Sequence, residues 1–186
     1  MADMHPISCD QDTLDTLAVS VTQDPPNRAL ELLDQALERY PRDARILLLR
    51  GSIYASIRDT VHARADFTRA MILSPALEEA RLMLGQLEYD EGMVDEARAV
   101  WSSFLSDTNP RTAVTLVGQA MVCLLDGLAE PAENHLRDAL LASPSEAIRT
   151  YIEQLLGRLD TRDAGGVGDG PSHYLLSDYL SSQSRH

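Results

Sequence analysis

The side chains that most often carry out catalysis are few and widely spaced in this sequence of 186 residues. None of the five histidines has a partner at metal-ligand spacing, and Cys9 and Cys123 lie too far apart to suggest a metal pair. No Gly-x-Ser-x-Gly nucleophile elbow and no His-Glu-x-x-His zinc motif occurs. We therefore expect no enzyme activity, no metal and no cofactor, and we expect both thiols to be reduced.

All 16 basic side chains are arginines, so chemistry that depends on lysine is excluded. Schiff-base catalysis and a phosphate-loop lysine need an amine that loses its proton or acts as a compact charge. The 29 acidic residues leave a formal net charge of −13, and such a field repels a polyanion. The sequence predicts no nucleic-acid partner.

Hydropathy argues against a membrane role. No apolar run approaches the roughly 20 residues that a membrane-spanning helix needs. The first ten residues, 1–10, lack the cationic and apolar regions of an export signal. We expect a cytoplasmic protein with no membrane association.

A repeat of about 34 residues sets the elements that position any functional side chain. In its clearest copies a small residue, a large residue, a second small residue and a proline follow one another at fixed intervals. The first copy is Ala29, Leu33, Ala36 and Pro41, and the second lies 34 residues later at Ala63, Phe67, Ala70 and Pro75. Four units fit the sequence, with bounds 10–43, 44–77, 78–112 and 113–146.

Each unit reads as two helices, because its apolar residues are spaced by three and four. The second unit predicts a helix from about Ala44 to Ile57 and another from about Thr60 to Leu73, with Asp59 as N-cap. Three dipeptides predict a capping residue with proline in the first helical turn: Ser74-Pro75, Asn109-Pro110 and Ser143-Pro144. Ser143 with Glu146 also predicts a capping box.

These units resemble the tetratricopeptide repeat (TPR) family, whose 34-residue helix-turn-helix has small, large and aromatic residues at fixed positions. The match is closest in unit two, at Leu47, Gly51, Tyr54, Ala63, Phe67, Ala70 and Pro75. The resemblance implies an all-α, TPR-like superhelical solenoid of about four helix-turn-helix repeats plus a C-terminal capping helix. It implies close helix crossings at Gly51 and Gly85, with an aromatic ring beside each.

Four positions depart from the family pattern. Arg50 and Arg81 stand where large apolar residues are expected, and Glu88 replaces a tyrosine. Phe104 replaces a small residue in unit three, which is also one residue long. We expect the helix phase of unit three to deviate from that of the other units.

The domain boundaries follow from these patterns. Residues 1–9 are expected to form an N-terminal tail, and residues 10–159 the TPR domain, which ends in a capping helix from about Ser145 to Leu159. Residues 160–172 are rich in glycine and predict a flexible linker. Residues 173–186 predict a short amphipathic tail, which docks on a partner, folds back into its own groove or stays disordered.

In the TPR family the first helix of each unit lines a concave face that holds a peptide. The resemblance implies a largely apolar groove here, which begins at Leu14 and Ala18 in unit one. Its central residues are Arg45, Leu48, Ser52, Leu82, Met83, Gln86, Tyr89, Val117, Met121 and Leu124. The alternative is that several of these side chains belong to the core.

Charge is unevenly distributed along the units. Unit two alone is basic, and its arginines either form a patch for an anionic partner or pair with acids across the stack: Arg45, Arg50, Arg58, Arg64 and Arg69. The acidic run in unit three predicts a solvated surface, with a site for a basic partner as the alternative: Glu88, Asp90, Glu91, Asp95 and Glu96.

The sequence favours a noncatalytic protein-protein interaction module, an adaptor or scaffold whose groove holds an apolar segment of another protein. One alternative is a chaperone similar to those of type III secretion, which keep hydrophobic clients soluble. Another is a regulatory subunit of an enzyme complex. Self-association into a homo-oligomer stays open, because the ends and convex faces of solenoids often pair.

Overall fold

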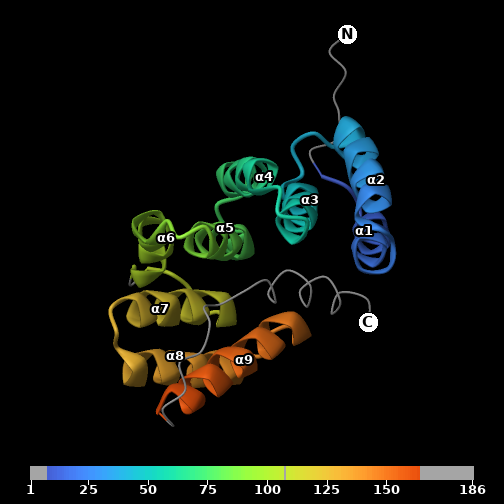
Figure 1. Cartoon of the computed structure of the whole chain (residues 1–186). Helices are drawn as coiled ribbons and strands as arrows, with labels where there is room; N and C mark the ends of the chain where they lie inside the picture. Colours follow the sequence, from blue (N-terminus) through green and yellow to red (C-terminus); the bar gives the residue numbers. More distant parts are fainter. Residues whose placement is uncertain (1–7, 107, 164–186) are drawn as a thin grey trace.

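The computed structural model describes residues 8–106 and 108–163, and this part of the chain is all-α (Figure 1). The first helices of the four units are α1 (Gln11–Gln23), α3 (Ala44–Ser56), α5 (Glu78–Asp90) and α7 (Ala113–Leu125). Their partners are α2 (Pro26–Arg39), α4 (Thr60–Leu73), α6 (Val94–Trp101) and α8 (Ala129–Leu141). A 3₁₀ turn, η1 (Ser102–Leu105), continues α6, and α9 (Glu146–Asp163) follows the last pair. The predicted helix pairs and the added helix are confirmed.

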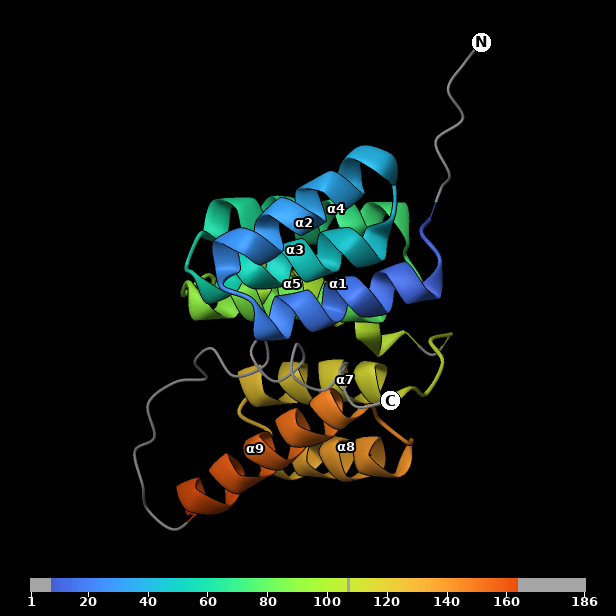
Figure 2. The same cartoon turned by 90° about the vertical axis from the view of Figure 1, so that its right-hand side faces the viewer.

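The pairs stack along a curved path, so that one helix of each pair lies inside the curve and the other outside (Figure 1). Helices α1, α3, α5 and α7 form the inner row and contact one another, while each outer helix packs against the next inner one. Helix α9 contacts α7 and α8 and crosses them obliquely (Figure 2). Across the described residues, every helix is too short or too polar to cross a bilayer.

Glycines on the inner helices let aromatic rings pack directly on backbone. A Cβ at Gly51 would lie 2.8 Å from Cε1 of Phe67, and one at Gly85 would overlap the Trp101 ring. Both rings are fully buried, and the indole N–H of Trp101 donates to the Leu82 carbonyl at 3.2 Å. The predicted close crossings at Gly51 and Gly85 are confirmed.

The deviation expected in unit three takes the form of a shortened helix. Helix α6 ends at Trp101, and the η1 turn then carries Phe104 inward, where it is fully buried. Its ring occupies the space that a Cβ at Gly118 of α7 would need. Phe104 therefore joins units three and four by the same aromatic-on-glycine packing that operates inside units two and three.

The helix N-termini confirm one predicted cap and correct three others. Asp59 accepts a hydrogen bond from the His62 N–H at 3.2 Å, as predicted for α4. The prolines at 75, 110 and 144 lie in the loops, because α5, α7 and α9 begin only at 78, 113 and 146. Ser143 is no capping-box residue: its φ is 54°, and Ser145 accepts the Ile148 N–H at 3.5 Å instead.

The ends of the described chain differ in detail from the expected boundaries. Cys9 is buried, and its N–H donates to Asp43 Oδ2 at 2.8 Å, so the chain is anchored before α1 begins. Helix α9 continues to Asp163, past the expected end at Leu159. Residues 164–172 of the expected linker and the expected tail at 173–186 lie outside the described residues.

Two residues that depart from the TPR pattern, Arg50 and Glu88, form ion pairs that join neighbouring helices. Arg50 donates to Asp66 of α4 at 2.7 Å and to Asp34 of α2 at 2.6 Å. Arg64 of α4 makes two hydrogen bonds, of 2.7 and 2.8 Å, to the buried Glu88 of α5. The prediction of a solvated acidic run is therefore wrong for Glu88, because this carboxylate lies between units two and three and neutralises Arg64.

The packing at Gly85 generates the first prediction. We expect Gly85→Ala to destabilise the fold by about 1 to 3 kcal/mol, because its methyl group would overlap the Trp101 indole. Gly157→Ala is the matched control, since nothing lies within 4 Å of the position of its Cβ. Urea unfolding followed by fluorescence of the single tryptophan measures both. Equal stability of the two variants would contradict the assigned packing.

Candidate functional site

The inner row of helices forms a concave face with two hollows. The first lies between α1, α3 and the start of α5 and has a volume of about 200 Å³. Its lining is mostly apolar, with one arginine and one glutamine: Gln11, Leu14, Ala18, Arg45, Leu48, Leu49 and Leu77. Such a lining suits an apolar side chain with a polar neighbour.

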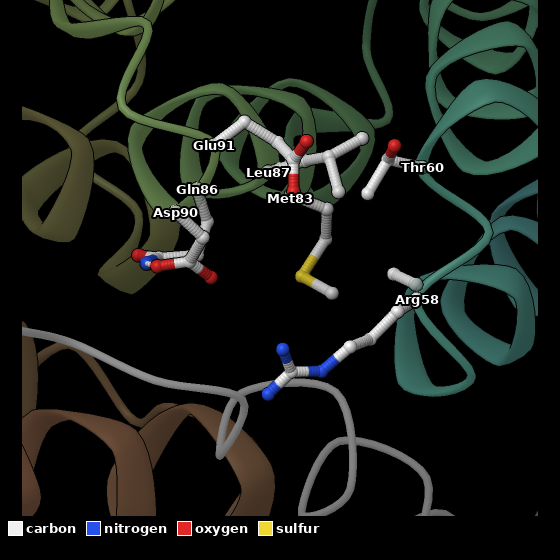
Figure 3. A pocket seen from close by; sticks show the side chains of 8 residues that line it. Arg58, Thr60, Met83, Gln86, Leu87, Asp90 and Glu91 are labelled. Atoms are coloured by element: carbon white, nitrogen blue, oxygen red, sulfur yellow. Dashed lines mark hydrogen bonds between the residues drawn. The ribbon is translucent and has the colours of Figure 1, made fainter.

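The second hollow lies between the end of α3 and α5 and has a volume of about 80 Å³ (Figure 3). It is more polar than the first, and its lining residues are Ala55, Arg58, Thr60, Met83, Gln86, Leu87, Asp90 and Glu91. The side chains of Met83 and Arg58 extend toward the same space (Figure 3). Gln86 Nε2 donates to Asp90 Oδ1 at 2.9 Å, which fixes one wall.

Helix α9 reaches this face through one tyrosine. The Tyr151 hydroxyl donates to Gln86 Oε1 at 2.8 Å and lies 3.6 Å from the Met121 sulfur. Burial raises the pKa of Tyr151, so the phenol stays protonated and acts as a donor. The capping helix therefore supports a residue that lines the second hollow. Sequence reasoning missed Tyr151, although it lies three residues after Ile148 and four before Leu155, on the face predicted to be apolar.

An ion pair with a polar backbone contact lies at the rim of the first hollow. Arg45 Nη2 donates to Asp43 Oδ2 at 2.7 Å and to the Cys9 carbonyl at 2.8 Å. Burial works against the charge of Asp43, but hydrogen bonds from Arg45 and from the Cys9 N–H outweigh it and lower the pKa of this carboxyl. The rim therefore carries a compensated pair.

Solved structures with this arrangement identify the fold. TTC0263, a thermophilic TPR protein in Thermus thermophilus, is similar with a TM-score of 0.61 at 20% identity, over 94% of this chain and 98% of that one. This chain has the fold of a tetratricopeptide repeat protein. PilW, a widely conserved type IV pilus biogenesis factor, is similar with a TM-score of 0.62 at 20% identity, over 95% of this chain and 78% of that one.

Sequence comparison gives a shorter match in a TPR protein. An 87-residue segment, 47% of this chain, is 33% identical to the tetratricopeptide repeat and J domain-containing co-chaperone DNJ1 of Fusarium oxysporum f. sp. lycopersici. The segment spans only 16% of that co-chaperone. No protein-family model matches the chain.

The TPR stack divides the predicted groove residues into two groups. The side chains of one group are buried: Leu48, Ser52, Leu82, Met83, Gln86, Val117 and Met121. The side chains of the other are partly exposed: Arg45, Tyr89 and Leu124. Arg45 and Leu48 meet in the first hollow, and Met83 and Gln86 meet in the second. The remaining six line neither hollow, and the assignment of the groove as a peptide site stays a prediction.

The arginines of unit two mostly pair with acids across the TPR stack. Arg45, Arg50 and Arg64 bind carboxylates, and Arg69 donates to the Pro41 carbonyl at 2.7 Å. Arg58 differs, because its guanidinium makes no hydrogen bond or ion pair with the described side chains. Its position beside the second hollow leaves one cation available for a ligand.

Side chains that could bind a metal or act as nucleophiles include histidines, carboxylates and thiols among the described residues. Clusters of three or more potential metal ligands are absent from that part of the chain. Burial, reinforced by Asp43, raises the pKa of the Cys9 thiol to about 11, and burial also raises the pKa of Cys123. Both thiols are protonated at neutral pH, which makes them weak nucleophiles.

The contact between α9 and the concave face generates a second prediction. We expect Tyr151→Phe to destabilise the protein by about 1 to 2 kcal/mol, because the buried Gln86 oxygen loses its donor. Tyr40→Phe is the control, since Tyr40 is partly exposed and its hydroxyl makes no described hydrogen bond. Urea unfolding measures both variants. A Tyr151→Phe variant as stable as the control would show that the hydroxyl contributes nothing.

The pKa of Cys9 generates a third prediction. At pH 8 we expect iodoacetamide to modify Cys9 about a hundredfold more slowly than an ordinary thiol, because its thiolate is scarce. The rate should rise about tenfold per pH unit up to about pH 11. Mass spectrometry of digested protein separates Cys9 from Cys123, and unfolded protein in urea provides the control. A rate that levels off near pH 8.5 would contradict the assigned environment.

Proposed function

We propose that this TPR protein is a noncatalytic interaction module that binds an apolar segment of another protein along its concave face. The first hollow carries the proposal, because its aliphatic floor lies on the inner row of helices and is open at a rim of Arg45 and Gln11. An aliphatic side chain fits a hollow of about 200 Å³. The adaptor or scaffold role follows from holding such a segment without changing it.

The energetics require more than one anchor in the bound segment. Full burial of one leucine or isoleucine contributes about 1.5 to 3 kcal/mol. Association and ordering of a peptide cost several kcal/mol, so a single anchor gives weak binding. A segment with two anchors, one in each hollow, fits the face better. The charged groups at the second hollow, Arg58, Asp90 and Glu91, then discriminate between partners.

A chaperone for a hydrophobic client is the second candidate. The observation that favours it is the 33% identity, over 87 residues, to a TPR co-chaperone. The adaptor and the chaperone would use the same concave face but bind different ligands. The adaptor holds a segment of a folded partner, whereas the chaperone holds an unfolded chain. Coexpression separates them, because a chaperone keeps soluble a client that aggregates when expressed alone.

The choice of test variant follows from burial. Met83 and Met121 are almost fully buried, so charged residues there would disrupt the core as well as the face. Leu14 lines the first hollow and is partly exposed, which makes it the better site for a charge. Ile72 on the outer helix α4 is 69% exposed and provides a matched apolar position on the convex side.

The fourth prediction concerns partner binding. We expect proteins captured by the intact chain to be lost with Leu14→Glu and retained with Ile72→Glu, because only the first substitution places a charge in the concave hollow. Affinity capture followed by mass spectrometry measures this, and circular dichroism confirms that all three chains are folded. The same captured proteins on all three chains would refute a concave binding face.

A further inference from the structure

We propose that residues 173–182 of this same chain occupy the concave face, so that the protein blocks its own binding site until a partner displaces them. The inference rests on the proposed function, because it names the first ligand of that face. Leu175, Leu176, Tyr179 and Leu180 are spaced by one, three and one, which places them on one side of a helix. This is the amphipathic chemistry that the two hollows accept.

The chain is long enough to return to the face. Tyr151 of α9 touches Gln86, which lines the second hollow, and α9 ends 12 residues later at Asp163. At a rise of 1.5 Å per residue, the end of α9 lies about 18 Å from that contact. The nine residues 164–172 span up to about 30 Å when extended. The segment that starts at residue 173 therefore reaches the second hollow with length to spare.

The size of the segment matches the spacing of the hollows. Leu48 lies in the first hollow and Ala55 in the second, and both belong to α3. Seven residues of helix separate them by about 10 Å. A ten-residue helix at 173–182 is about 15 Å long, so it covers both hollows at once. This supplies the two anchors that useful affinity requires.

The backbone at Arg58 is strained, which points to a role for its side chain. Arg58 has a φ of 63°, in the left-handed region that disfavours a side chain. Gly92 and Gly127 occupy the corresponding turns of units three and four, with φ of 78° and 73°. Unit two thus keeps a strained arginine where glycine would fit, and this arginine makes no ion pair with the described residues. Its side chain extends toward the second hollow (Figure 3).

The proposed tail supplies one partner for this cation. Asp178 is the only acidic side chain between residues 173 and 186. On a helix it lies beside the apolar side formed by Leu175 and Tyr179. We therefore assign Asp178 as the residue that pairs with Arg58 when the apolar side faces the hollows. The pairing fixes the orientation of the segment on the face.

Tethering makes even a weak segment an effective block. A linker of this length gives an effective concentration of about 1 mM. A segment whose free peptide binds with a Kd of about 10 µM then reduces the apparent affinity of a competitor about a hundredfold. A partner with several anchors overcomes this reduction, and a short apolar peptide does not. The tail would thus raise the threshold for binding.

The test uses full-length chains and a fluorescein-labelled peptide of residues 173–186. We expect the peptide to bind the intact chain at least tenfold more weakly than a full-length variant that carries Leu176→Asp and Tyr179→Asp. Adding Leu14→Glu to that variant should remove binding, whereas adding Ile72→Glu should not. Fluorescence anisotropy measures the affinities, and circular dichroism confirms the helix content of each chain.

The ionic contact is tested in the same Leu176→Asp, Tyr179→Asp chain. Adding Arg58→Gly should weaken binding of the peptide severalfold but leave binding of an Asp178→Asn peptide unchanged. The Arg58→Gly chain should also melt at a higher temperature, because glycine relieves the left-handed backbone. Lower stability with weaker binding of both peptides would overturn the assignment of Arg58.

Two outcomes overturn the proposal as a whole. Equal affinity of the peptide for the intact and the tail-substituted chain would show that the tail does not occupy the face. No binding to either chain would show that the face does not accept this segment. Both outcomes leave the capture experiment with Leu14→Glu and Ile72→Glu intact, so the two proposals fail separately.

Discussion

The close approach of aromatic rings to glycine backbone is the constraint on which this solenoid depends. Phe67 packs on Gly51, Trp101 on Gly85 and Phe104 on Gly118, and all three rings are fully buried. Because each glycine lies on an inner helix, the ring of an outer element fills the space that a side chain would take. This sets how closely the two rows approach and so shapes the concave face. Phe104 repeats this packing of a ring on glycine between units three and four, which compensates for the early end of α6 at Trp101.

Ionic contacts complete the stack, and their chemistry suits a chain whose basic residues are all arginines. The guanidinium of Arg50 joins α3 to both α2 and α4. The guanidinium of Arg64 donates two parallel hydrogen bonds to the Glu88 carboxylate. A lysine makes no such planar double contact. Arg50 and Arg64 thus use their charge between packed helices of the stack.

Periodicity predicted the helix pairs well, because the 34-residue spacing repeats the small residues that close packing requires. It predicted the crossings at Gly51 and Gly85, and Asp59 as a cap. It did not predict the cap of α9, because Ser143 and Ser145 both precede suitable residues and only the backbone distinguishes them. It identified Arg50 and Glu88 as departures from the repeat pattern. It did not predict their ion-pair partners, because these lie on other helices. The peptide groove was inferred by position in the repeat, and burial of individual side chains is set by neighbours that no single repeat contains.

Tyr151 shows how such a neighbour changes the site. Gln86 was predicted as a groove residue, and in the structure its amide oxygen accepts from Tyr151 while its nitrogen donates to Asp90. If a ligand draws Gln86 toward the second hollow, Gln86 loses one of these two hydrogen bonds. Because Tyr151 belongs to α9, loss of its hydrogen bond to Gln86 would remove a contact between α9 and α5. The Gln86 amide thus joins the wall of the second hollow to the C-terminal helix.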